Sequence, residues 1–477
     1  MVVFYGANDG YFRAVEANTG KERWAFIAPE FYSRLARLKN QTPLVNYPNV
    51  AGTGDLAATG TQKDYFFDGS TGVFQTADNS RIWLYPTMRR GGRMVYGLDA
   101  TSLSSPRLLW SAGCPNLNND DNCTPGFEDL GQTWSTPSAA LVGGYSLTTP
   151  IVIFGGGYDN CEDANTGAPT CSAGKGGRVY VLDGANGAKL ASFETERGVV
   201  GDIAMVDIDN DGMPDYAYAA DLGGNIYRID FIDGPVTKAR LAPEQWTMYK
   251  VAYTTGGARK FLFAPALLYS KGQVYIAIGS GDREHPLGWQ YPYENVANRF
   301  YVSLDDLAVR DSTRARNLDA LTDYSGSTDC NSPAALLSTG LKGWFMTLRK
   351  GEQVVTTAQI VGGTVMFSTN QPIVGSAASC RTALGEARGY IVNLFNASGA
   401  IGVDGYCGGT RSSVFVGGGL PPSPVLATGV PVKGRRVSVV IGAVPKGGGS
   451  GAAISPQKVR PSITSVRKRS YTYVKGQ

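Results

Sequence analysis

The sequence predicts an all-β protein of the β-propeller class, built from repeated four-stranded sheets. Three observations predict it. The 477-residue chain contains 62 Gly and 25 Pro, a composition that suits many short strands joined by tight turns. One short apolar signature recurs six times, and further apolar segments around it have the length of strands. Because each unit then holds four strands in sequence, the repeats are expected to be the blades of a propeller.

The recurring signature is predicted to be the third strand of each unit and the turn that follows it. Its copies are residues 11–20 (YFRAVEANTG), 93–101 (RMVYGLDAT), 177–187 (GRVYVLDGANG), 225–230 (NIYRID), 298–305 (NRFYVSLD) and 389–399 (GYIVNLFNASG). The Asn186-Gly187 pair is typical of a hairpin turn, since both residues tolerate positive φ. A β-sandwich seldom repeats one signature six times, so the propeller is favoured.

The unit around residues 136–193 shows the complete pattern. Predicted strands cover 136–142, 151–157, 178–183 and 189–193. Pairs of first and second strands recur at 264–268 with 274–279, 357–361 with 364–369, and 422–426 with 437–442. The first unit lacks a preceding strand and the last ends loosely. We therefore expect the two chain ends to pair, closing the ring and supplying a seventh blade.

Residues 1–477 are expected to form a single β-propeller domain with long insertions between strands. The insertions cover residues 31–63, 114–133, 159–174 and 306–342. Loops on a rigid scaffold are where binding usually occurs. Residues 447–457 are Gly-rich and predicted to be flexible, and residues 458–477 form a basic C-terminal segment. That segment is either solvated or a docking surface for an acidic partner.

Seven cysteines indicate an exported protein. Cys114 and Cys123 bracket one short polar loop, and Cys161 and Cys171 bracket another. A metal site would need CxxC spacing or His partners, so we predict two disulfides. Cys380–Cys407 is the third pair we would choose, which leaves Cys330 unpaired. The chain starts in an apolar strand rather than a signal peptide, so we expect a fragment of a longer exported protein.

Composition excludes several classes of function. A formal net charge of +4 over this length does not indicate nucleic-acid binding. No apolar run approaches the roughly 18 residues of a transmembrane segment. The single histidine, His285, excludes His-rich zinc sites, and with no evident nucleophile beside it we interpret it as structural. We expect no enzymatic activity.

Residues 207–215 (DIDNDGMPD) fit the D-x-D-x-D-G-x-x-D pattern of an EF-hand-like calcium loop. Ca²⁺ is a hard cation that takes six to eight oxygen ligands, and carboxylates at alternate positions of a tight loop converge on one point. Gly212 would make the sharp turn. The predicted ligands are the side chains at positions one, three, five and nine, the last directly or through water, and the carbonyl at position seven: Asp207, Asp209, Asp211, Asp215 and Met213.

Calcium is favoured over an empty polar turn, because four acidic groups in nine residues repel one another unless a cation neutralises them. Magnesium prefers fewer carboxylates and a tighter octahedral geometry. The twelfth position, a bidentate Glu in EF-hands, is Tyr218 here, which predicts an affinity of about micromolar or weaker. Residues 202–206 and 216–220 are predicted strands, so the loop should lie on a β-hairpin. The pairs Asp120-Asp121 and Glu162-Asp163 are interpreted as solvated loop residues.

Several runs together, in this order, resemble the PilY/PilC family of type IV pilus tip-associated adhesins and biogenesis factors. They are GANDGYFRAVEANTGKERWAF, DYFFDGS, FGGGYDN, VDIDNDGMPDYAYAADLGGNIYRID, GSGDREHP, GWFMTL and GGGLPPSPV, and they extend to about Val425. The resemblance implies a C-terminal domain with a modified seven-bladed, quinoprotein-dehydrogenase-like propeller. It also implies calcium ligation by the five residues named above.

The resemblance further implies a role in pilus assembly and attachment. The expected partners are minor pilins and the type IV pilus assembly machinery, together with host-cell or abiotic surfaces. The expected location is the periplasm or outer membrane, the pilus tip or the cell surface. Calcium occupancy is expected to regulate pilus extension against retraction, hence twitching motility. Relatives carry a larger N-terminal region, and this chain has no Arg-Gly-Asp triplet for integrin binding.

A quinone-dependent propeller dehydrogenase is the alternative function. Residues 6–24 resemble the A-x-D-G-x-x-x-A-x-D-x-x-T-G-x-x-x-W motif of that class, with Glu16 where Asp is usual. The motif is convincing only once, and the adjacent Cys-Cys pair of those enzymes is missing from the sequence. Their metal ligands come from several blades, whereas the acidic residues here lie in one loop. A third class, a propeller that only scaffolds other pilus proteins, is not separated from an adhesin by sequence.

Overall fold

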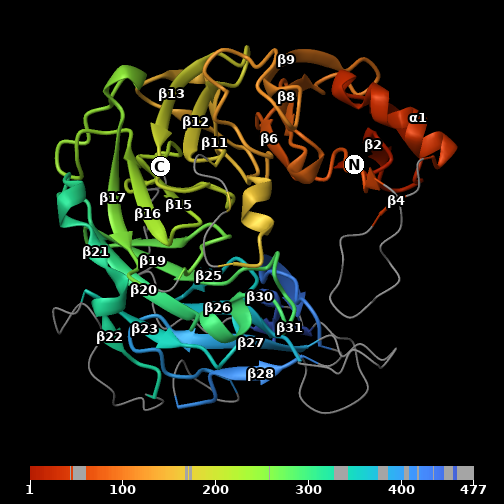
Figure 1. Cartoon of the computed structure of the whole chain (residues 1–477). Helices are drawn as coiled ribbons and strands as arrows, with labels where there is room; N and C mark the ends of the chain where they lie inside the picture. Colours follow the sequence, from red (N-terminus) through yellow and green to blue (C-terminus); the bar gives the residue numbers. More distant parts are fainter. Residues whose placement is uncertain are drawn as a thin grey trace, which may run out of the picture.

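The computed structural model describes residues 1–42, 45–46, 61–166, 170, 174–256, 258–326, 342–373, 385–401, 408–415, 418–432, 435–444 and 455–458. Within them, seven sheets of three to five strands follow one another along the chain, and β4 (Val45–Asn46) pairs with β5 (Thr61–Gln62) as an additional two-stranded sheet. Figure 1 shows the seven sheets around a ring, from the N-terminal strands in red to the C-terminal strands in blue. The chain is therefore a β-propeller, as predicted.

The first three blades are simple antiparallel sheets in chain order. Blade 1 contains β1 (Val2–Gly6), β2 (Phe12–Glu16) and β3 (Glu22–Phe26). Blade 2 contains β6 (Thr71–Gln75), β7 (Ile82–Pro86), β8 (Arg93–Asp99) and β9 (Arg107–Cys114). Blade 3 contains β10 (Ser138–Val142), β11 (Ser146–Gly155), β12 (Arg178–Asp183) and β13 (Lys189–Glu194).

Blades 4 and 5 each add a short parallel strand to four antiparallel ones. Blade 4 contains β14 (Ala204–Val206), β15 (Tyr216–Ala220), β16 (Asn225–Asp230), β17 (Thr247–Tyr253) and β21 (Arg316–Asn317). Blade 5 contains β18 (Ala266–Ser270), β19 (Gln273–Gly279), β20 (Arg299–Asp306), β23 (Gly343–Thr347) and β22 (Thr322–Asp323). The added strands come from the predicted insertion 306–342, so this insertion extends two sheets.

The last two blades contain the C-terminal strands. Blade 6 contains β24 (Gln353–Val354), β25 (Gln359–Val361), β26 (Thr364–Gln371), β27 (Glu386–Asn393) and β28 (Ser412–Val414). Blade 7 contains β29 (Val425–Val432), β30 (Arg435–Val444) and β31 (Ser455–Lys458). The described α-helices are α1 (Tyr32–Asn40), in the insertion 31–63 at the rim in Figure 1, and α2 (Pro292–Asn295). None of the described helices has the length and apolarity needed to cross a membrane.

The expected pairing of the two chain ends depends on residues 459–477, which lie outside the described residues. In the described residues, β1–β3 and β29–β31 form separate three-stranded sheets, and no strand pair joins them. Within the described residues, the seventh blade consists of β29, β30 and β31. β31 covers the last three residues of the predicted Gly-rich segment and Lys458, the first of the basic segment. Most of the Gly-rich segment lies outside the described residues as well.

Apolar clusters between neighbouring blades form the core. Separate clusters lie between blades 1 and 2, 2 and 3, 3 and 4, 4 and 5, 5 and 6, and 6 and 7. The first strands of blades contact one another, β6 with β10 and β14 with β18, so they line the centre of the ring. Trp134, Tyr158, Val200, Leu222 and Leu262 form another cluster near the segments that lead into these first strands.

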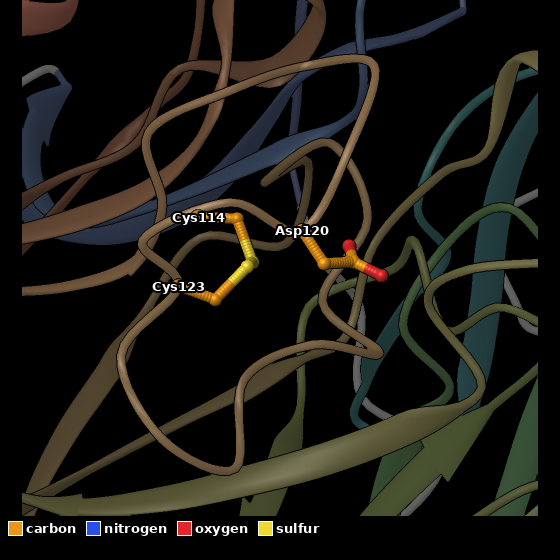
Figure 2. A group of neighbouring side chains, drawn as sticks. All are labelled: Cys114, Asp120 and Cys123. Carbon is orange, nitrogen blue, oxygen red and sulfur yellow. A yellow bond between two sulfur atoms is a disulfide. The ribbon is translucent and has the colours of Figure 1, made fainter.

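The first Cys loop is closed by a disulfide between Cys114 and Cys123, as predicted. Figure 2 shows Asp120 beside this bridge. The three side chains resemble a metal site in their spacing, but both sulfur atoms are in the disulfide. Asp120 instead pairs with Arg93 and Lys175, each at 2.8 Å. This group therefore has a structural role.

The second Cys loop lies partly outside the described residues. Cys161 is disulfide-bonded, and its expected partner, Cys171, is outside them, as are Cys330, Cys380 and Cys407. The described part of the loop is held by ion pairs: Glu162 with Lys260 at 3.1 Å, and Asp163 with Arg90 at 3.0 Å. This loop is thus tied to Arg90, between β7 and β8 of blade 2, and to Lys260, in the connection between blades 4 and 5.

His285 joins the same network as a buried residue, 4% exposed. Its Nδ1 lies 2.9 Å from Asp282, whose carboxylate also accepts from Lys260 at 2.8 Å, and its Nε2 lies 3.3 Å from the carbonyl oxygen of Asp163. Burial alone lowers the pKa of His285, but the hydrogen bond to Asp282 and the charge of that carboxylate outweigh it and raise the pKa above 6.5. These contacts agree with the structural role predicted for this histidine.

We expect Arg93→Ala to destabilise the protein by about 3 kcal/mol. The Arg93 side chain, 4% exposed, donates to the carbonyl oxygens of Leu130, Asn119 and Glu128 and to Asp120. Removing it takes the donor from the carbonyl oxygens of Leu130 and Asn119, whereas Asp120 and the carbonyl oxygen of Glu128 keep Lys175. Urea unfolding measures the change, and Lys175→Ala, which removes a more exposed cation from Asp120, should cost less than about 1 kcal/mol. Equal losses in the two variants would contradict this role for Arg93.

We expect the stabilising effect of His285 to fade as the pH rises. A histidine whose pKa is raised by folding stabilises the folded state below its unfolded pKa, and this contribution is lost as the pH passes through the folded value. The difference in Tm between the parent and His285→Gln should therefore be largest below pH 6.5 and shrink above it. Thermal unfolding at several pH values measures this difference. A difference that grows with pH would disprove the expectation.

Candidate metal site

The predicted metal loop lies at the start of blade 4, between its first two strands. β14 and β15 pair antiparallel, with Val206 opposite Tyr216 and Ala204 opposite Tyr218. The nine residues between them, 207–215, are the acidic run. The amide of Asp215 donates to the carbonyl oxygen of Val206 at 2.9 Å and closes the loop. The structure thus places the loop on a β-hairpin, as the sequence predicted.

Asp207 organises the loop from within. Its carboxylate accepts hydrogen bonds from the amides of Asn210 at 2.6 Å, Gly212 at 2.8 Å and Asp209 at 3.2 Å. Burial raises the pKa of Asp207, but these amides outweigh it, and the pKa lies below the usual value. Gly212 has φ of 89°, a conformation that glycine adopts without strain. The loop is therefore shaped by its own backbone around a charged carboxylate.

Asp215 is the buried member of the loop, 0% exposed. Its Oδ2 accepts from the amide of Ile208 at 2.8 Å, and its Oδ1 lies 3.3 Å from Arg240. Burial raises the pKa of Asp215 above the usual value, and the neighbouring charge of Asp209 adds to that rise. The carboxylate of Asp215 is thus buried next to other carboxylates, and a cation bound beside it would stabilise its charged form.

Three of the four predicted carboxylates converge. Asp207, Asp209 and Asp215 each offer an oxygen atom, and the three oxygens lie within 4.8 Å of one another. Asp211 is not in this group: one of its oxygens accepts from the amide of Met213 at 2.9 Å and the other pairs with Arg240. Met213 is half-buried at the seventh position of the loop.

Two cations missed by sequence reasoning face these carboxylates. Lys238 Nζ lies 3.4 Å from Asp209, and Arg240 pairs with both Asp211 and Asp215. Both cations lie between β16 and β17 and are distant from the acidic run in sequence. The sequence shows two basic residues at alternate positions, Lys238 and Arg240. No nearby residue indicates which carboxylates these two side chains contact.

The twelfth position is unsuited to a metal for a reason that the structure supplies. Tyr218 is fully buried in β15, and its hydroxyl donates to Asp305 of blade 5 at 2.7 Å. Asp305 in turn pairs with the buried Arg228 at 2.9 Å. This position is used to join two blades, so any ion in the loop would depend on ligands from residues 207–215 and on water.

The donor set fits a hard divalent cation. Three carboxylate oxygens converge within a short loop. The turn at Gly212 is open, since an added Cβ would have no atom within 4 Å. The loop has four aspartates and only two facing cations, Lys238 and Arg240, so its carboxylates are not fully neutralised by the protein. Ca²⁺ accepts such flexible, carboxylate-rich sets more readily than Mg²⁺ does. In the described residues, the carboxylates of this site come from one loop rather than from several blades.

Comparison with known proteins identifies relatives of the whole propeller. The family model described as the PilY1 beta-propeller domain matches residues 1–253. The type IV pilus biogenesis factor PilY1 of Pseudomonas aeruginosa strain UCBPP-PA14 is 30% identical over 253 residues, 50% of this chain and 18% of that protein. A PilY1 homolog from Xylella fastidiosa is 25% identical over 460 residues, 86% of this chain and 27% of the relative. The chain thus spans less than a third of the length of these curated relatives.

Solved structures show a similar fold. The crystal structure of the Pseudomonas aeruginosa PilY1 C-terminal domain aligns over 92% of this chain and 90% of that one, with a TM-score of 0.61 and 18% identity. A europium-containing methanol dehydrogenase aligns over 93% of this chain and 72% of the enzyme, with a TM-score of 0.45 and 12% identity, which is too distant to support a dehydrogenase function. Because the family model covers more than half of the residues, this chain belongs to the PilY1 family, within its beta-propeller domain.

Proposed function

We propose that this chain is the propeller part of a type IV pilus biogenesis factor whose role is binding and regulation, without a catalytic step. Membership of the PilY1 family supports the pilus role. The relatives described above are type IV pilus biogenesis factors. The expected partners of the propeller are minor pilins and the pilus assembly machinery. It is expected to be exported, to the periplasm or outer membrane, the pilus tip or the cell surface.

The second part of the proposal is a calcium ion held by residues 207–215. The calcium proposal is supported by the convergence of Asp207, Asp209 and Asp215, whose carboxylate oxygens lie within 4.8 Å of one another. Asp211 and the carbonyl of Met213 would complete the ligands from the chain. When bound, the ion would neutralise the loop's carboxylates. Residues 207–215 would thereby set the shape of one edge of blade 4, and that edge would meet the partners that control extension and retraction.

Attachment to host-cell or abiotic surfaces is the third part of the proposal. It rests on the family's pilus role and on the long insertions, of which 306–342 adds the strands β21 and β22 to blades 4 and 5. Attachment and assembly are separable. Loop variants that form normal pili but fail to attach would support an adhesin, whereas variants that lose pili would support assembly.

We expect the chain to bind one Ca²⁺ with an affinity of about micromolar or weaker, since the bidentate twelfth ligand is replaced by Tyr218. Asp209→Ala and Asp215→Ala should each weaken binding at least about tenfold, because each removes a charged ligand. Calorimetric titration of chelator-treated protein measures this. Asp121→Ala, an exposed carboxylate in the first Cys loop, is the matched control and should bind like the parent. Absence of calcium heat and of calcium-dependent stabilisation in the parent would refute the site.

We expect Asp209→Ala in the full-length pilus protein to change pilus number and twitching without lowering its export. Removal of one loop carboxylate leaves the core of blade 4 intact, since Asp209 is exposed. Pilus counts, twitching zones and the amount of exported protein are measured together, with Asp121→Ala as the control strain. Normal pili and normal dynamics in a strain whose variant has lost calcium binding would contradict calcium regulation.

A further inference from the structure

The segment between β16 and β17 forms a tight hairpin against the acidic loop. The amide of Leu241 donates to the carbonyl oxygen of Phe231 at 2.9 Å, and Ile232 pairs with Arg240 across the hairpin. The amide of Ala239 donates to the carboxylate of Asp233 at 2.8 Å. We call residues 231–241 the basic hairpin, because it carries Lys238 and Arg240.

The basic hairpin begins next to the last carboxylate of the metal loop. The amide of Phe231 donates to the carbonyl oxygen of Asp215 at 2.9 Å. From this shared point, the hairpin turns back and places its cations on the loop: Lys238 on Asp209, and Arg240 on Asp211 and Asp215. Three of the four carboxylates predicted to hold the metal therefore already have a cation from the same chain. The fourth, Asp207, is satisfied by backbone amides instead.

A glycine turn of blade 3 provides the space for Arg240. A Cβ at Gly143 would lie 2.9 Å from the Nε of Arg240, and a Cβ at Gly144 would lie 1.9 Å from the carbonyl oxygen of Leu241. Residues with side chains at these two positions would push the hairpin away from the turn. The Arg240 side chain, 26% exposed, thus lies between the turn of blade 3 and the acidic loop, and its guanidinium pairs with Asp211 and Asp215.

We propose that Lys238 and Arg240 are resident competitors of the metal, which lower the calcium affinity of the loop and are released from it when calcium binds. The proposal rests on the calcium function proposed above. A metal ion drawing on Asp211 and Asp215 would lie within a few ångströms of the guanidinium, and the two positive charges repel. The position of Asp211 supports the competition, because it pairs with Arg240 and lies outside the converging group.

Release of the basic hairpin gives the competition a structural consequence. Val236, at the tip of the hairpin, is 90% exposed. The hairpin contacts the metal loop through the ion pairs of Lys238 and Arg240. An ion bound in the loop would break these ion pairs and so remove contacts that hold the hairpin against the loop. Calcium binding in the loop is thereby coupled to the surface formed by residues 231–241.

The first test is the calcium affinity of Arg240→Gln and Lys238→Gln, measured by calorimetry. Removing a competitor should tighten binding, and for Arg240→Gln the Kd should fall by about 5-fold or more, the range of ordinary coupling between two ligands. Lys250→Gln is the matched control: it removes a positive charge from the same blade, where Lys250 pairs with Glu196 instead. Its Kd should stay within about 2-fold of the parent, the change expected from screened charge alone.

The second test measures release directly. Amine labelling of the parent protein, followed by mass spectrometry, should modify Lys238 faster in Ca²⁺ than in chelator, because calcium frees its ammonium group from Asp209. The labelling rate of Lys250 should not change. This measurement does not depend on whether a variant folds.

The outcomes separate the two proposals. If the parent binds calcium but Arg240→Gln and Lys238→Gln bind it no more tightly, or labelling of Lys238 is unaffected by calcium, the competition is wrong while the calcium site stands. If neither the parent nor Arg240→Gln binds calcium, the calcium site itself is wrong. Tighter binding in both variants, together with faster labelling of Lys238, supports the competition.

Discussion

The structure depends on burying both faces of each central strand between neighbouring blades. All residues of β15 and of β16 are buried, as are nearly all of β12 and β20. Neither face of such a strand is exposed to solvent, so a blade is stable only with a neighbouring blade packed on each side. Burial of apolar surface between blades therefore stabilises the ring as a whole. This constraint fixes the ends of the strands in space. It therefore also fixes where the loops between them, including residues 207–215, can lie.

Buried ion pairs fix the position of blade 4 relative to blade 5. Arg228 is fully buried and pairs with Asp230 at 2.6 Å and with Asp305 of blade 5 at 2.9 Å. Burying ions costs desolvation energy, which is offset only when the partners are well placed. Tyr218 donates to the same Asp305 at 2.7 Å. The strand that leaves the metal loop is thus anchored by a network that tolerates little displacement, whereas Asp209 and Asp211 of the loop are exposed.

Features set by local sequence could be predicted, and features set by contacts between distant segments could not. The acidic loop, its flanking strands and the Cys114–Cys123 disulfide follow from residues a few positions apart. Nothing local shows which terminal strands meet: β1–β3 and β29–β31 form separate sheets in the described residues, and residues 459–477, on which the expected closure depends, lie outside them. The cations on the loop were missed for the same reason: Arg240 reaches Asp215 across 25 residues of chain.

The metal loop combines a rigid half and an exchangeable half. Asp207 accepts three backbone amides, so its turn is formed by the chain alone and needs no ion to hold it. Asp209, Asp211 and Asp215 also face side-chain cations. Asp211 and Asp215 each accept one backbone amide as well, so only their contacts to Lys238 and Arg240 are open to exchange with an ion. A preformed turn lowers the ordering cost of binding, whereas displacing internal cations raises the cost. For the calcium site proposed above, opposing terms of this kind would give an occupancy that changes with the surrounding calcium concentration rather than a permanently held ion.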